Sequence, residues 1–188
     1  MPEKTTNHTN NLITAVHGVM LEISGLGVLI IGDSGMGKSD LALELISRGS
    51  RLISDDVVKI RCSEQSKLTG TSPKRTKHLM EIRGLGIINI IDLYGPESVL
   101  GEKQIDMVIE LCKWDSDTEY DRLGIDERSY KIAGVDLPYI LIPVSPVRNT
   151  ALIVEVAALK QGIQSSDGEA RKRIWDQLNN IGSVASIK

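Results

Sequence analysis

The residues best suited to chemistry are the eight from Gly32 to Ser39, Gly-Asp-Ser-Gly-Met-Gly-Lys-Ser. They match G-x-x-x-x-G-K-[ST], the pattern of a phosphate-binding loop. The glycines permit turns that aim successive N–H groups into one concavity, and the helix that follows adds a positive end. Lys38 would bring its ammonium group to the terminal phosphates, and the Ser39 hydroxyl would bind Mg²⁺. The predicted binding residues are Gly32, Asp33, Ser34, Gly35, Met36, Gly37, Lys38 and Ser39.

The carboxylate pair Asp55-Asp56 is the second candidate. Alternation along a strand would send the two side chains to opposite faces, so that only one points at the phosphates. A carboxylate there can orient Mg²⁺ or accept a proton from an attacking hydroxyl group. A hydrophilic turn between two strands is the alternative. The short stretch from Lys38 to Asp56 has room for one helix only, which argues against the common GTPase layout.

Four further positions could belong to the same site. His17 is either a core residue or part of the site. Glu81 and Arg83 have the spacing of one strand face, where they form a structural ion pair or, beside a phosphate loop, hold Mg²⁺ and neutralise phosphate charge. Arg122 lies in the acidic, turn-rich stretch 114–127, which nothing in the sequence holds rigid. An arginine in such a loop can reach a transferring phosphoryl group, although a surface arginine is more common.

The pattern around these residues predicts the elements that position them. The apolar run Leu26–Ile31 predicts a buried strand before the loop, and Leu41, Leu45 and Ile46 predict one apolar face of a helix that ends near Gly49. The order is strand-dominated with few helices, so it predicts a mixed α/β fold and not a regular βαβ alternation. We expect two strands within 12–31, a polar loop around residue 70, further strands at 51–54, 57–60, 105–111, 130–132 and 139–144, and helices at 150–160 and 167–179.

Length and composition narrow the classes of protein. A chain of 188 residues suits one domain, here residues 12–188, after a polar and flexible tail, residues 1–11. The net charge of −3 and the 3% aromatic content argue against nucleic-acid binding. Cys62 and Cys112 have no motif spacing, which predicts reduced core thiols in a cytoplasmic protein. No apolar run is long enough for a membrane span, and the polar start is not a signal peptide.

Taken together, the motifs resemble the catalytic domain of the HPr kinase/phosphorylase family over about His17 to Lys160. The stretch Met80–Asn89, Met-Glu-Ile-Arg-Gly-Leu-Gly-Ile-Ile-Asn, matches the family signature. The other matching segments are His17-Gly-Val, Gly32–Ser39, Asp55-Asp56, Asp121-Arg-Leu-Gly and Arg148-Asn149. The resemblance implies a kinase core akin to phosphoenolpyruvate carboxykinase and typically a homohexamer. Larger members carry an additional N-terminal domain that has no counterpart here, so we expect the short, catalytic-domain form.

The activity that the resemblance implies is an ATP- and Mg²⁺-dependent phosphorylation of a serine of HPr, the small phosphocarrier protein of the sugar phosphotransferase system. It also implies a reverse reaction, in which inorganic phosphate attacks phosphoserine and releases pyrophosphate. Pro143–Arg148 corresponds to the segment tied to this reverse reaction. Within it, Val147 stands where the family commonly has Gly, and a branched residue disfavours positive φ. This departure bears on the reverse reaction and not on the kinase reaction.

The family's residue roles, carried over by position, are as follows. Asp56 would take the serine proton, and His17 would lie beside Asp56 and the phosphates. Lys38 would stabilise the bridging and terminal phosphate oxygens. Ser39 and Glu81 would hold Mg²⁺, and Arg122 would offset charge in the transition state. Asp55, Arg83 and Arg148 are the remaining candidates.

Two other functions fit the same residues. One keeps the chemistry and changes the target to another protein or a small hydroxylated metabolite. The other is a nucleotide-sensing regulatory module without transfer activity. A pure sensor has no need of Asp56, Glu81 and Arg122 together, so the kinase is the leading hypothesis.

Overall fold

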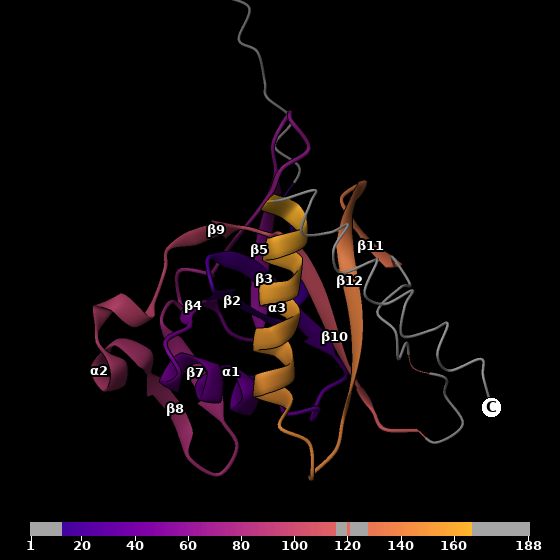
Figure 1. The fold of residues 1–188 in the computed structure, drawn as a ribbon. Helices are drawn as coiled ribbons and strands as arrows, with labels where there is room; N and C mark the ends of the chain where they lie inside the picture. The colour runs from indigo at the N-terminus through magenta and orange to yellow at the C-terminus, as the bar shows by residue number, and fades with distance from the viewer. Residues whose placement is uncertain (1–12, 116–119, 121–127, 167–188) are drawn as a thin grey trace, which may run out of the picture.

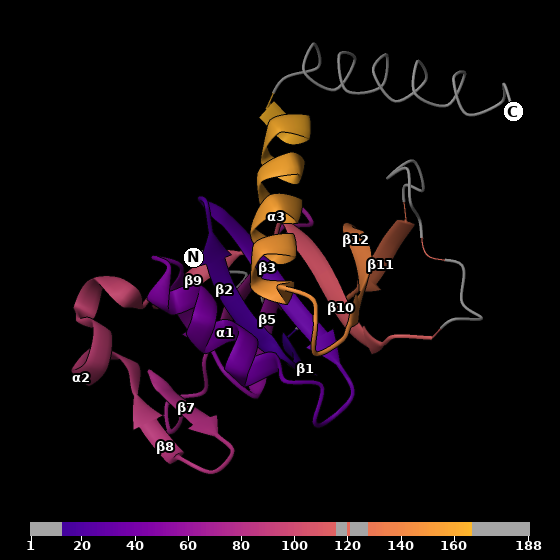
Figure 2. The same cartoon turned by 60° about the horizontal axis from the view of Figure 1, so that its bottom comes forward.

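A computed structural model describes residues 13–115, 120 and 128–166 (Figures 1 and 2). The strands are β1 (Ile13–His17), β2 (Val19–Ile23), β3 (Leu26–Gly32), β4 (Arg51–Ser54), β5 (Val57–Cys62), β6 (Leu68–Thr71), β7 (Leu79–Ile82), β8 (Gly86–Asn89), β9 (Glu102–Gln104), β10 (Met107–Lys113), β11 (Arg128–Ile132) and β12 (Val135–Val144). The helices are α1 (Lys38–Ser47), α2 (Ile90–Tyr94), the 3-10 turn η1 (Pro96–Ser98) and α3 (Thr150–Ser166). The predicted mixed α/β, strand-rich fold is confirmed.

Within these ranges, the strands form a central sheet, a second sheet and a hairpin. The central sheet has the order β11-β12-β10-β3-β2-β4, in which β3, β10 and β12 are parallel and the other pairs are antiparallel. The second sheet has the order β1-β5-β6-β9, and β7 pairs with β8. Helices α1 and α3 lie against one face of the central sheet, while the β7–β8 hairpin and α2 project to one side (Figures 1 and 2).

Strand β3 shows why the layers stack in this way. Val28 and Ile30 face the helices in one buried cluster, whereas Leu29 and Ile31 face the second sheet in another. A strand buried on both faces needs a continuous apolar run, which is what the sequence has here. Burial of each such side chain contributes about 1.5–3 kcal/mol. The strand that leads into the glycine-rich loop is therefore held firmly between two layers.

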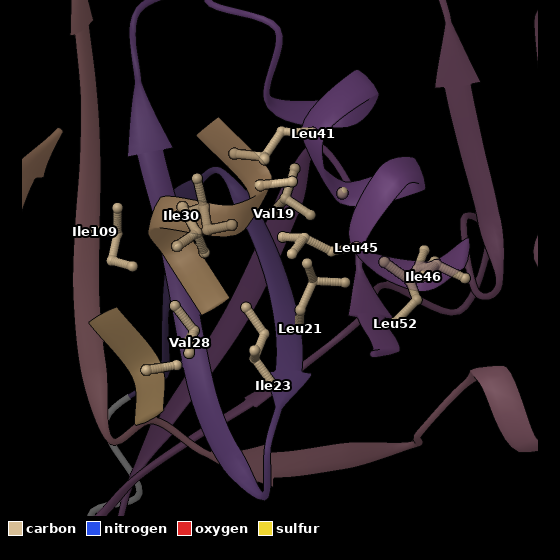
Figure 3. Close-up of a cluster of buried hydrophobic side chains, with 14 of the residues drawn as sticks. Val19, Leu21, Ile23, Val28, Ile30, Leu41, Leu45, Ile46, Leu52 and Ile109 are labelled. Atoms are coloured by element: carbon tan, nitrogen blue, oxygen red, sulfur yellow. The ribbon is translucent and has the colours of Figure 1, made fainter. Parts of the chain in front are cut away.

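Helix α1 begins directly after the loop and buries one face. Leu41, Leu45 and Ile46 are buried, as predicted, and pack against the sheet (Figure 3). Ala42 is buried as well. The helix ends at Ser47, close to the predicted end near Gly49. In the turn that follows, the Gly49 N–H donates to the Ile46 carbonyl oxygen at 2.9 Å. The face that packs on the sheet fixes the direction in which the helix start points.

The prediction of two strands within 12–31 is wrong, because the chain forms three. Gly18 separates β1 from β2, and its N–H donates to the Asp56 carbonyl oxygen at 3.0 Å. A Cβ at Gly18 would lie 2.5 Å from the Ile30 carbonyl oxygen, so a larger residue does not fit. The break lets β1 pair with β5 in the second sheet while β2 pairs with β3 in the central sheet.

Other boundaries differ from the sequence-based expectation for similar reasons. The predicted polar loop contains β6, where Gly70 leaves room for Met20: a Cβ on Gly70 would meet the Met20 sulfur. A glycine inside a strand has no side chain, so it interrupts the side-chain pattern from which a strand is predicted. Helix α3 runs to Ser166 rather than to residue 160, and the expected helix at 167–179 lies outside the described residues. The remaining predicted strands are present, with ends shifted by a few residues.

Two smaller expectations can also be compared with the fold. Cys62 and Cys112 are free, as predicted, but both are only partly buried. In the described ranges, no helix combines the length and the apolar character that crossing a membrane requires.

Candidate active site

One edge of the central sheet collects most of the predicted site residues. Strands β3, β10 and β12 run in parallel, and β4 runs in the same direction as β3 because both are antiparallel to β2. Their carboxyl ends therefore meet at one edge, followed by the glycine-rich loop after β3, Asp55 after β4, and residues 145–149 after β12. His17 reaches the same edge from β1, next to the start of β2. Ligands of open α/β sheets bind at this kind of edge.

The glycine-rich loop has the backbone shape that the motif requires. A Cβ on Gly32 would lie 2.5 Å from the Leu111 carbonyl oxygen, so glycine alone permits this approach of β3 to β10. Gly37 caps α1 with φ of 80°, in the left-handed region. The first N–H groups of a helix have no partner within it and can bind an anion. This loop is a cradle of the kind predicted for phosphate.

Lys38 lies at the first position of α1 and folds back over the loop. Its Nζ donates to the carbonyl oxygens of Gly32 at 2.7 Å and Asp33 at 2.9 Å. The ammonium group thus lies beside the cradle, near enough for a short rearrangement to exchange these carbonyl oxygens for phosphate oxygens. Its charge suits the terminal phosphates.

Ser39 and Asp55 form the buried corner of the site. The Ser39 hydroxyl donates to Asp55 Oδ1 at 3.0 Å, and the Glu81 backbone N–H donates to Asp55 Oδ2 at 3.2 Å. Asp55 is only 4% exposed, and this burial raises the pKa of its carboxyl, while the two hydrogen bonds act in the opposite direction. A helix-start serine beside a buried carboxylate offers two oxygen ligands to a divalent cation. Sequence patterns alone assign Asp55 no definite role, because its contact with Ser39 exists only in the folded chain.

Asp56 and His17 form an exposed pair beside that corner. Asp56 Oδ1 lies 3.3 Å from His17 Nδ1, and the two side chains are 68% and 75% exposed. The expectation that Asp55 and Asp56 alternate along a strand is wrong, because both lie in the bend between β4 and β5. Asp56 has φ of 67°, a left-handed conformation that aspartate tolerates better than most residues. The bend still separates the two carboxylates, one inward and one outward.

Glu81 and Arg83 lie on the β7–β8 hairpin and its turn, and both side chains are exposed. No ion pair between them is found in this part of the described structure, so the structural ion pair, one of the two alternatives, does not form. Glu81 is tied to the site through its backbone N–H on Asp55. Across the described residues, no three His, Cys, Asp or Glu side chains gather as a metal cluster. A cation here would need further oxygens from water or from a phosphate chain.

Arg148 lies just before α3, where its guanidinium is held in place. Nη1 donates to the Pro143 carbonyl oxygen at 3.2 Å, and Cζ lies 5.8 Å from the centre of a Trp114 ring. Trp114 in turn stacks on Tyr120 at 5.2 Å between ring centroids. The expectation that nothing holds the stretch 114–127 is therefore wrong for these two aromatic residues. Arg122 lies outside the described residues.

Comparison with known proteins defines the class of this domain. A family model described as "HPr Serine kinase C-terminal domain" matches residues 10–178. The chain therefore belongs to the family of HPr serine kinase C-terminal domains.

Relatives and a solved structure carry the comparison further. The chain is 49% identical over 186 residues to the HPr kinase/phosphorylase of Geobacillus thermodenitrificans, covering 95% of this chain and 60% of that protein. It is 46% identical over 169 residues to the HPr kinase/phosphorylase of Listeria monocytogenes, covering 90% of this chain and 54% of the relative. The solved HPr(Ser) kinase/phosphatase of Coxiella burnetii has a TM-score of 0.77 and 31% identity, covering 85% of this chain and 97% of that one. The chain thus spans little more than half the length of these two bacterial relatives.

Proposed function

We propose that this domain binds ATP at the loop Gly32–Ser39 and transfers its γ-phosphoryl group to a serine hydroxyl of HPr. The observation that carries the proposal is the meeting of three features at one sheet edge. These are the glycine cradle with Lys38, the Ser39–Asp55 corner, and the exposed His17–Asp56 pair. Family membership supports the same reaction, since relatives at 46–49% identity bear the name HPr kinase/phosphorylase.

The oxygen atoms of Ser39 and Asp55 fit a magnesium ion. They lie 3.0 Å apart, at the start of α1 and beside the cradle. Mg²⁺ is usually held in kinases by one or two protein ligands, with substrate phosphates and water completing its shell. When bound, Mg²⁺ would neutralise the charge that develops on the phosphate oxygens. We assign Ser39 and Asp55 as its protein ligands, and Glu81 as a residue whose carboxylate could join them by rotating from solvent.

Asp56 is the general base of the proposed reaction. Its exposed carboxylate can meet a serine on another protein, whereas the buried Asp55 cannot. Asp56 accepts the serine proton as the serine oxygen bonds to the γ-phosphorus. The bond from phosphorus to the bridging oxygen breaks, and its electron pair stays with ADP. His17 holds the Asp56 carboxylate in place, and Lys38 stabilises negative charge on the phosphate oxygens.

The reverse reaction uses the same groups in the opposite order. Inorganic phosphate attacks the phosphoserine, Asp56 returns a proton to the serine oxygen, and pyrophosphate leaves. Val147 is not among the described residues with positive φ, so its branched side chain is accommodated without backbone strain. Arg148 ends the segment Pro143–Arg148, which we associate with the reverse reaction, and its guanidinium donates to the Pro143 carbonyl oxygen. A homohexamer and a cytoplasmic location complete the proposal, the latter in keeping with two free thiols.

The decisive experiment incubates the protein with γ-labelled ATP, Mg²⁺ and purified HPr. We expect label on one HPr serine, and none on HPr in which that serine is replaced by alanine. Lys38→Ala should lose transfer and weaken ATP binding together, because the lysine contacts the phosphates. Label on other proteins but not on HPr would indicate a different target. ATP binding without transfer to any acceptor would indicate a sensor.

A further inference from the structure

A cavity of about 500 Å³ opens directly beside the glycine-rich loop. Its walls come from the end of the loop (Met36 and Gly37), the first two turns of α1, the end of β10, and the segment Val144–Thr150 before α3. This volume lies within the range of roughly 300–1,000 Å³ that small-molecule sites occupy. None of the residues assigned above to proton transfer or to Mg²⁺ lines it, whereas Met36 and Gly37 of the loop and Arg148 do, so the cavity adjoins the proposed phosphate site.

The position of the cavity matches the path of a phosphate chain that leaves the loop. Phosphates held by the loop are also held by the first N–H groups of α1, from Lys38 to Asp40. The cavity continues from Gly37 along Asp40, Leu41 and Glu44. A group attached to the far end of such a phosphate chain would therefore enter it.

The lining of the cavity suits a sugar and a base better than further phosphates. Apolar side chains such as Met36, Leu111 and Val144 form part of the wall, and Asp40 adds a carboxylate. Glu44 adds a second carboxylate, one oxygen of which already accepts a hydrogen bond from Arg48, and Arg148 is the cation of the lining, where it already donates to the Pro143 carbonyl oxygen. Carboxylates repel phosphate oxygens but accept hydrogen bonds from sugar hydroxyls and from the amino groups of bases. The Asn149 Oδ1 is already taken by the Leu152 N–H at 2.9 Å, which leaves its amide N–H groups to face a base acceptor.

We propose that this cavity holds the nucleoside of the bound nucleotide, its ribose beside the carboxylates and its base against the segment Val144–Thr150. The inference rests on the proposed function, since it requires the phosphates to occupy the loop. It also explains why the His17–Asp56 pair is absent from the lining. In phosphoryl transfer the attacking and leaving oxygens lie on opposite sides of phosphorus, so the nucleoside and the acceptor hydroxyl belong on different sides of the loop.

The test compares ATP with inorganic triphosphate, which has the phosphate chain but no nucleoside. Val147 lines the cavity and is 94% exposed, so Val147→Trp adds an indole there without disturbing the core. Val156→Trp is the matched control, because Val156 is also exposed, lies on α3 and does not line the cavity. Calorimetry with Mg²⁺ gives the Kd of each ligand for each protein.

We expect Val147→Trp to change the ratio of the two Kd values by about fivefold or more, through ATP alone, whether the indole blocks the base or stacks on it. Val156→Trp should leave the ratio within about twofold of wild type. Azido-ATP should photolabel a peptide that contains residues 144–150. An unchanged ratio in Val147→Trp, with both ligands bound, would overturn the cavity assignment alone. If neither ligand binds the wild-type protein, the proposed function itself fails.

Discussion

Two adjacent carboxylates, Asp55 and Asp56, have opposite environments. Asp55 is buried, accepts hydrogen bonds from Ser39 and from the Glu81 backbone, and has a raised pKa because of its burial. Asp56 is turned to solvent, in a left-handed backbone conformation, and contacts His17. A buried carboxylate with fixed donors is suited to holding a cation, and an exposed one is suited to meeting a hydroxyl on another protein. The bend between β4 and β5 therefore gives two adjacent carboxylates the different environments that the two proposed roles require.

The largest expected effect comes from Asp56→Asn, which removes the proposed base and keeps the shape of the side chain. Transfer to HPr should fall by about 10²–10⁴-fold, the range that a general base contributes. ATP binding, measured by calorimetry, should stay within about twofold of wild type because Asp56 does not contact the cradle. The control is Asp136→Asn, an aspartate of similar exposure on β12, which should retain full activity. Equal turnover in the two variants would remove Asp56 from the mechanism.

Asp55→Asn tests the proposed role of the buried carboxylate as a ligand of Mg²⁺. The Mg²⁺ concentration that gives half-maximal transfer should rise by about 10–100-fold, since one charged ligand is lost. Asp106→Asn is the matched control, because Asp106 also accepts a backbone hydrogen bond, from Gly27 at 2.7 Å, but lies apart from Ser39. A normal Mg²⁺ requirement in Asp55→Asn would show that the cation is held elsewhere, with Glu81 the next candidate.

His17→Ala should have a smaller effect, because His17 positions the Asp56 carboxylate and does not take the serine proton. We expect kcat for HPr phosphorylation to fall about tenfold, with KM for ATP unchanged. In a double-mutant cycle, His17→Ala should add little to the loss already caused by Asp56→Asn. Fully additive losses would mean that the histidine acts independently of the carboxylate.

The smallest effect is on stability and follows from the raised pKa of Asp55. When a carboxyl has a higher pKa in the folded than in the unfolded protein, the folded protein loses stability as pH rises through the ordinary pKa of 3.8 and beyond. Asparagine carries no charge and escapes this loss. The Tm of Asp55→Asn relative to wild type should therefore increase from about pH 3 to about pH 7, by about 2–4 °C for each kcal/mol involved. Thermal unfolding without Mg²⁺ measures it.

A pH-independent control accompanies this measurement. Ile53→Val removes one methylene from the neighbouring buried strand β4 and changes no ionisable group. Its Tm difference from wild type should stay constant over the same pH range. A constant difference for Asp55→Asn as well would mean that burial does not disfavour the charged form of this carboxyl.

Particular residues show what could be predicted before the fold was known. The loop Gly32–Ser39, strand β3 and the buried face of α1 were predicted correctly, because each depends on local backbone preferences or on hydrophobic periodicity. The break at Gly18 and strand β6 were missed. In both places a glycine is required by close contact with a residue distant in the chain, Ile30 for Gly18 and Met20 for Gly70. The held position of Trp114 was missed for the same reason: its partners are Tyr120 and Arg148.

The amino-acid sequence by itself determined that a glycine-rich loop opens directly into a helix with Lys38 at its start, because the glycines, the lysine and the helix start are contiguous. Only the tertiary structure decided which of two adjacent aspartates turns inward, that His17 meets Asp56 through the pairing of β1 with β5, and that a cavity opens between α1 and the segment before α3. These outcomes depend on contacts between segments far apart in the chain, and such contacts are set by how the two buried layers pack together.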